Sequence, residues 1–175
     1  MKTNQSNNTH IATLSCLKST LLYATVLIFA TMLTSCDSSV YYSDNKAIDN
    51  ATWNIYDTIM FDVNVKSEDI SEAYNFLIDL RNTKNYPYSN AFLFIKTIFP
   101  DGGFALDTME CPLTEPSGRW YGKVSSNHVD NRFYLRKNTI FPQNGIYRFE
   151  IFHGLRDTNV EGIKSIGLRI EKTQQ

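Results

Sequence analysis

The sequence predicts an all-β protein: an antiparallel β-sandwich of the jelly-roll or immunoglobulin-like type, with about 7–9 strands. Three observations support this prediction. Apolar and polar residues alternate along several short segments, turn-forming residues separate these segments, and no long stretch has helical periodicity. The aromatic content of 13% suits a core between two sheets, because inward-facing rings can supply much of the buried area.

The predicted strands are short runs rich in β-branched and aromatic residues. The clearest are residues 61–65, 74–81, 91–96, 147–153 and 165–171. Four of these runs alternate between apolar and polar residues, so each should bury one face. Residues 91–96 are apolar on both sides, which is typical of a central strand covered on both faces.

The segments between these strands contain turn residues, in clusters at 85–89, 100–103, 115–118 and 142–145. Proline fixes φ, glycine supplies positive φ, and aspartate or asparagine caps the turn. Residues 158–163 could hold one short turn of helix. The spacing of the turns therefore indicates hairpins and crossovers rather than long helical connections.

The N-terminal residues have the three parts of an export signal. Residues 1–20 contain no acidic residue, residues 21–32 are uncharged and mostly apolar, and small residues follow. The apolar run is short for a membrane-spanning helix. The sequence LTSC at 33–36 matches a lipobox. We therefore predict that residues 1–35 are a cleaved lipoprotein signal and that Cys36 carries the lipid; an ordinary signal peptide with a chance cysteine is the alternative.

The predicted mature chain has two parts. Residues 36–51 are rich in Ser, Asp and Asn and should form a flexible tether, and residues 52–175 should form one β-sandwich domain. Removal of Lys2 and Lys18 with the signal leaves 15 basic and 18 acidic residues, a net charge of −3. Because this balance is mildly acidic, we predict no nucleic-acid partner.

No catalytic motif is recognisable in the mature chain. Its two histidines, His128 and His153, lie in no metal-ligand spacing, and we assign them to a loop and to a strand end. Cys111 is expected to be buried as a small apolar residue, with a reactive thiol as the alternative. We therefore predict that the protein is no enzyme and has no cofactor and no metal site.

Aromatic residues near the predicted turns are the better candidates for a binding surface. They are Trp53, Tyr86, Tyr88 and Trp120. Exposed Trp and Tyr rings can stack on sugars or anchor a partner protein at low entropic cost. The alternative is that these rings close the ends of the sandwich.

Several short motifs resemble the gliding-motility lipoprotein family GldH of Bacteroidetes. They are Trp53 with YDT at 56–58, YPYSN at 86–90, DTME at 107–110, GRWYG at 118–122, GIYRFEI at 145–151 and VEGIKSIGLRIE at 160–171. Each motif is weak alone, and their order and spacing behind a lipobox carry the resemblance. It extends over nearly the whole mature domain.

The resemblance implies a non-enzymatic envelope lipoprotein that supports the gliding and secretion machinery as an accessory or scaffold component. Its partners would be a membrane, bound through the lipid at Cys36, and other envelope proteins of that complex. We expect the outer membrane rather than the inner membrane, and its periplasmic side. The alternative function is a glycan- or ligand-binding β-sandwich lipoprotein, in which the four candidate aromatic residues would share one exposed face.

Two Asp-Thr-apolar triplets, at 57–59 and 107–109, look like the sequon for O-glycosylation of exported Bacteroidetes proteins. Thr58 and Thr108 are therefore candidate modification sites. The alternative is that Asp-Thr simply begins a strand at each place.

Overall fold

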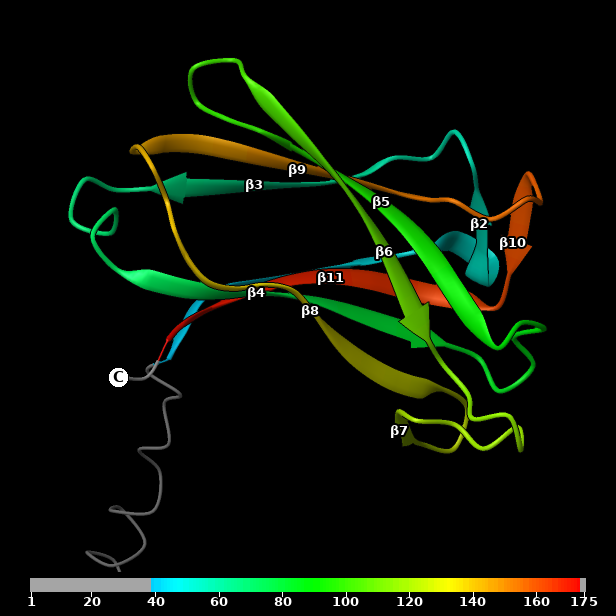
Figure 1. The fold of residues 1–175 in the computed structure, drawn as a ribbon. Coiled ribbons are helices and arrows are strands. Elements are labelled where there is room, and N and C mark those ends of the chain that lie inside the picture. The colour runs from blue at the N-terminus through cyan, green and yellow to red at the C-terminus, as the bar shows by residue number, and fades with distance from the viewer. Residues whose placement is uncertain (1–38, 174–175) are drawn as a thin grey trace, which may run out of the picture. The chain divides into compact units, whose positions relative to one another are not determined.

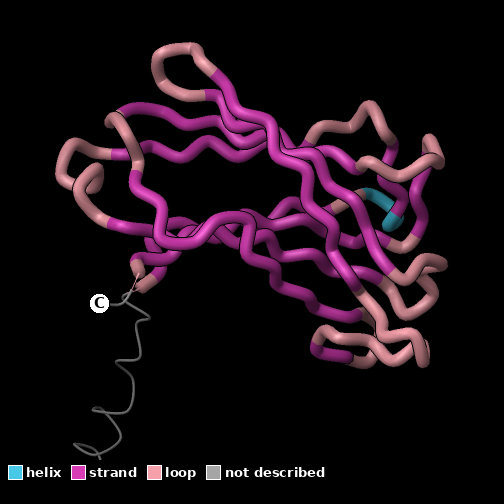
Figure 2. Tube along the Cα trace, viewed as in Figure 1, coloured by secondary structure: helices cyan, strands magenta, loops and turns pink. Residues whose placement is uncertain are grey.

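The structure is a computed structural model and describes residues 39–173. Within these residues the chain forms eleven β-strands and one 3-10 turn. They are β1 (Val40–Ala47), η1 (Asp49–Ala51), β2 (Thr52–Asn54), β3 (Ile59–Val65), β4 (Ala73–Asn82), β5 (Asn90–Ile98), β6 (Phe104–Pro112), β7 (Lys123–Val124), β8 (Val129–Ile140), β9 (Gly145–His153), β10 (Asn159–Glu161) and β11 (Ile163–Lys172). Helix is confined to η1, and loops join the strands at their ends (Figure 2).

Two antiparallel sheets face each other, one in the order β1-β11-β4-β8-β7 and the other in the order β3-β9-β5-β6 (Figure 1). A third, two-stranded sheet pairs β10 with β2. Apart from the short strands β2, β7 and β10, the chain changes sheet at every step except between β5 and β6, which form a hairpin. This alternation is the jelly-roll arrangement, and it confirms the predicted all-β sandwich.

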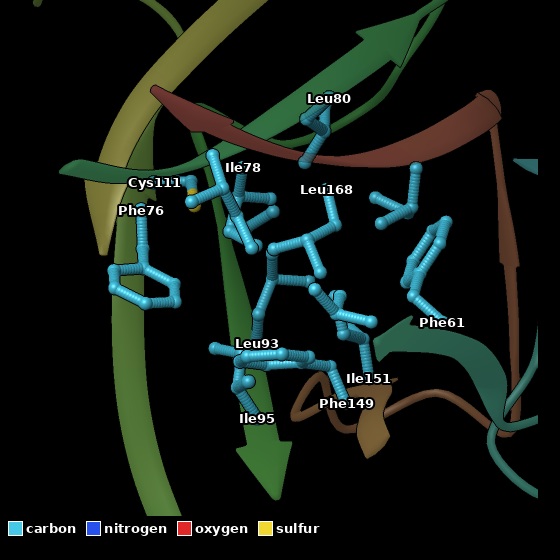
Figure 3. Packing of buried hydrophobic residues seen from close by; sticks show 14 of the residues in the cluster. Phe61, Phe76, Ile78, Leu80, Leu93, Ile95, Cys111, Phe149, Ile151 and Leu168 are labelled. Carbon is cyan, nitrogen blue, oxygen red and sulfur yellow. The ribbon is translucent and has the colours of Figure 1, made fainter. Parts of the chain in front are cut away.

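The core lies between the two larger sheets because their strands alternate as the sequence predicts. β3 buries Phe61, Val63 and Val65 and exposes the residues between them. Leu93 of β5 and Leu168 of β11 come from opposite sheets and both point into this core (Figure 3). One apolar layer therefore holds both sheets together.

An aromatic cluster fills the core near the start of β4 and the end of β8. Phe141 is its centre, with ring centroids 4.9–6.1 Å from those of Tyr41, Tyr74, Phe76 and Tyr147. The rings are tilted or edge-on to one another, the arrangement that their charge distribution favours.

The structure differs from the expected tether. Residues 40–47, which we placed in a flexible tether ending at 51, form β1 and pair with β11 at the edge of the five-stranded sheet. Polar residues in an edge strand can face water on the exposed side, so the Ser, Asp and Asn content concealed the strand.

The expected helical turn at residues 158–163 is also wrong. Residues 159–161 form β10, which pairs with β2 and buries Val160 directly opposite Trp53. β6 and β8 were also not predicted from the sequence. Each face of β6 mixes apolar and polar residues, so the alternation is weak in the sequence.

Candidate functional site

The titratable side chains that could carry chemistry are held in structural roles. Burial raises the pKa of the Cys111 thiol to about 12, because a thiolate would lose its hydration there. Cys111 points into the core beside Phe76 and Ile78 (Figure 3). The thiol is therefore protonated at neutral pH and shielded from reagents, as expected for a small buried residue.

The two histidines also lie in separate places. His153 is buried at the end of β9, with its ring edge against Trp53 at a centroid distance of 5.3 Å. Burial lowers the pKa of His153, which keeps the ring neutral. His128 Nε2 lies 3.1 Å from Asp130 Oδ2, and Asp130 also accepts a hydrogen bond from Arg81. Residues 39–173 contain no group of three side chains placed to hold a metal ion.

The structure corrects two of the four candidate aromatic residues. Trp53 is 1% exposed, and its indole N–H donates to the Asp57 carbonyl at 2.8 Å. Tyr86 is also buried, and its hydroxyl donates to the Asn90 carbonyl at 3.0 Å. Both rings belong to the core and satisfy their polar group internally, so neither can contact a ligand.

Tyr88 and Trp120 are placed differently from these two. Tyr88 is exposed and its hydroxyl bonds to the Asp157 carboxylate. It borders a hollow of about 500 Å³ that Asn90, Phe92 and Arg156 also line. Trp120 is half-buried and packs against the core. The four residues therefore do not form one exposed face.

The candidate modification sites are accessible. Thr58 is exposed just before β3, and Thr108 is exposed on the outward side of β6, directly opposite Phe94 of β5. Cys36 lies outside the described residues.

The clearest candidate surface was missed in the sequence: the outward face of the four-stranded sheet, here called the apolar face. Its most exposed members are Phe104 (66%), Ile146 (61%), Leu106 (59%) and Met60 (51%). Half-buried rings continue it, since Phe94 of β5 and Phe152 of β9 lie 5.5 Å apart on the same side. Apolar positions on both sides of residues 91–96 were the available signal.

The apolar face also carries ordered ion pairs. Arg148 binds Asp62 through Nε and Nη2 at 2.8 and 3.0 Å, and Lys96 lies 3.4 Å from Glu150. These pairs connect neighbouring strands across the face. Exposed apolar patches that are rimmed by polar residues mark interaction surfaces.

Comparison with known proteins decides the family. Residues 40–170 match the family model described as GldH lipoprotein. This chain belongs to the GldH lipoprotein family. The match includes the whole of β1–β10 and nearly all of β11, so it covers the folded part of the molecule.

Two curated relatives agree with this result. The chain is 30% identical over 156 residues to a gliding motility lipoprotein GldH homolog of Christiangramia forsetii, covering 85% of this chain and 94% of the relative. It is 29% identical over 154 residues to the gliding motility lipoprotein GldH of Flavobacterium johnsoniae, covering 84% and 94%. Membership in this family makes the chain a lipid-anchored protein of the cell envelope.

Similarity to solved structures is much weaker. An arabinose-bound α-L-arabinofuranosidase aligns with 78% of this chain and 23% of its own length, at 10% identity and a TM-score of 0.37. The VP2 subviral particle of infectious bursal disease virus aligns with 78% of this chain and 34% of its own length, at 16% identity and a TM-score of 0.35. Scores this low carry no argument about function. No helix within residues 39–173 is long and apolar enough to cross a bilayer.

Proposed function

We propose that this GldH lipoprotein is a non-enzymatic docking subunit that joins a membrane to other proteins of a gliding or secretion complex. The exposed apolar face is the observation that carries the proposal. Four large apolar side chains that are more than half exposed on one sheet are typical of a surface that a partner covers. The family match supports a gliding or secretion complex as the place of action, because the relatives are gliding motility lipoproteins.

The lipid at Cys36 would hold this domain close to its membrane. Four Cα–Cα steps join Cys36 to Val40, the first residue of β1, and four extended residues span at most about 14 Å. This reach is much shorter than a tether ending at residue 51 would allow. A partner must therefore meet the domain near the membrane, which fits another envelope protein on the periplasmic side of the outer membrane.

The apolar face suits a protein partner better than lipid tails. Arg148–Asp62 and Lys96–Glu150 lie among the apolar side chains, and burying such charges in hydrocarbon would be costly. At a protein interface the same groups can remain paired or accept partner contacts at the rim. We infer an envelope protein with an apolar patch as the occupant.

The test compares matched surface variants of the full-length chain. F104D with L106D places two charges on the apolar face, and Y134D places one on the outward face of the other sheet, where Tyr134 is 52% exposed. After mild detergent extraction from the native envelope, the wild-type protein and Y134D should sediment in one large particle. The F104D/L106D variant should sediment as a free subunit with unchanged thermal stability.

Two outcomes would contradict the proposal. One is sedimentation of the wild-type protein as a free subunit, and the other is release by Y134D as complete as release by the double variant. Cross-linking from position 106 should also yield an adduct with an envelope protein of the particle, while cross-linking from position 134 should not.

The hollow beside Tyr88 favours ligand binding as a second candidate function. One exposed ring, an amide and a guanidinium line it, which suits a small polar ligand better than a protein. Only Tyr88 remains exposed from the four predicted aromatic residues, so the stacking area is small. A ligand whose binding survives Y88A unchanged would exclude this site.

A further inference from the structure

A polar trough crosses the outward face of the five-stranded sheet. Its volume is about 460 Å³, and the side chains that border it include Asn45, Asp79, Arg81, Asp130 and Arg132. The strand register explains its direction. Asn45 pairs with Gly167, which pairs with Asp79, which pairs with Arg132, so this row runs across four strands.

A second row lies beside the first and extends it to the last strand. Ser165 pairs with Arg81, Arg81 with Asp130, and Asp130 with Lys123 of β7. β7 lies beside the start of β8 at the edge of the sheet (Figure 1). From β1 to β7 the trough covers four inter-strand spacings, or about 19 Å.

β11 carries small residues in both rows, so side chains of the neighbouring strands can lie over it. Gly167 has no side chain, and a Cβ there would lie 2.8 Å from Asn45 Nδ2 and 3.1 Å from the Asp44 carbonyl. Ser165 occupies the equivalent place in the second row. A larger residue at position 167 would collide with the Asn45 side chain and the β1 backbone.

Two carboxylates hold the arginines of the trough in fixed orientations. Arg132 donates to Asp79 through Nε at 2.6 Å and Nη2 at 2.9 Å, and Arg81 donates to Asp130 through Nε at 2.6 Å. A guanidinium has five N–H donors, so each arginine keeps donors that these carboxylates do not use. Lys123 is exposed and forms no ion pair with residues 39–173. Preoriented donors therefore exceed acceptors along the trough.

We propose that this trough binds an extended acidic oligosaccharide. A sugar strand supplies the hydroxyl and carboxylate oxygens that the free arginine and lysine donors require. An extended peptide would instead need apolar pockets or a free strand edge, and the side chains along these two rows are polar. Arg81, Arg132 and Lys123 face Asp79 and Asp130, so the excess positive charge is small and a nucleic acid would not be held.

The test measures binding of two glycan strands to the full-length protein in detergent. One is a fluorescently labelled peptidoglycan glycan strand, in which alternate sugars carry a lactyl carboxylate; the other is a neutral N-acetylglucosamine oligomer of equal length. The acidic strand should bind more tightly. R132Q and K123A should each weaken its binding by about tenfold, the loss expected for one charged hydrogen bond.

R148Q is the matched control, because Arg148 makes the same two-bonded contact with Asp62 on the opposite outward face. It should leave glycan affinity unchanged. K123A should fold normally, because Lys123 is exposed and carries no ion pair with the described residues. Weaker glycan binding in this variant would therefore not be explained by misfolding. Absence of binding by the acidic strand, equal loss with R148Q, or tighter binding of an extended hexaglutamate peptide would each overturn the proposal. Docking through the apolar face is independent of this result, because the two surfaces lie on different sheets.

Discussion

The two outward faces of this sandwich differ in chemistry although the same core supports them. The five-stranded sheet presents oriented charges and the exposed ring of Tyr134, whereas the four-stranded sheet presents exposed Phe, Leu, Ile and Met side chains. Each face has one arginine bound to an aspartate by two hydrogen bonds: Arg132 with Asp79 on one sheet, Arg148 with Asp62 on the other. What distinguishes the faces is therefore the surroundings of these pairs.

Folding and binding depend on opposite sides of each sheet. Inward residues decide stability, since they bury apolar area between the sheets, and outward residues are largely free to vary. A face that keeps large apolar side chains in water contributes little to folding. Its composition is better explained by something that it binds.

The largest expected effect tests this separation directly. Leu93 and Leu106 lie on the inner and outer sides of the same sheet, 0% and 59% exposed. L93A should lower the free energy of unfolding by roughly 2–5 kcal/mol, because it removes buried methyl groups and leaves a cavity. L106A should change it by less than about 0.5 kcal/mol. Urea unfolding of both variants measures the difference.

An equal loss in the two variants would contradict this assignment of folding to the inward residues. It would mean that Leu106 is covered within the monomer and that the apolar face supports the fold. An L106A variant that keeps the wild-type unfolding free energy but fails to enter the large particle would support the assignment of this face to docking.

Period-two alternation made the sandwich predictable from sequence, but not the use of its faces. β3 and β9 alternate clearly, so their inward residues were evident. Residues 91–96 are apolar on both sides, and alternation alone cannot distinguish a strand covered twice from one with an exposed apolar side. The prediction of a central strand was correct for the sheet order, because β5 lies between β9 and β6.

The polar trough could not be predicted because it depends on register between distant segments. Asn45, Asp79, Arg132 and Gly167 become neighbours only when β1, β11, β4 and β8 pair in this order. Trp53, in contrast, was wrongly predicted to lie on a binding surface. Its ring is large enough for a binding surface, but β10 pairs beside β2, and His153 packs against the ring.

A smaller effect concerns the core rather than either face, and it depends on pH. His153 is buried with a lowered pKa, so between that value and the unfolded value near 6.5 the unfolded chain binds more protons. Stability should therefore fall as pH falls below about 6.5, with a slope of at most about 1.4 kcal/mol per pH unit. Urea unfolding at several pH values measures this slope.

H153F should flatten this part of the pH profile, since phenylalanine keeps an aromatic ring against Trp53 and has no proton to bind. A steep slope that persists in H153F would assign the acid sensitivity to other groups. Binding through the apolar face should be unaffected by the substitution, because the His153 side chain points inward.

Modification of Thr58 and Thr108 should change the unfolding free energy least. Both hydroxyls are exposed, so we propose that both carry an O-glycan, with no measurable change in the unfolding free energy. Mass spectrometry of tryptic peptides from the protein purified from its own envelope should show both peptides shifted, and T58A and T108A should each remove one shift. Unshifted peptides would exclude the modification. The site at Thr108 matters most, because it lies on the apolar face beside Phe94.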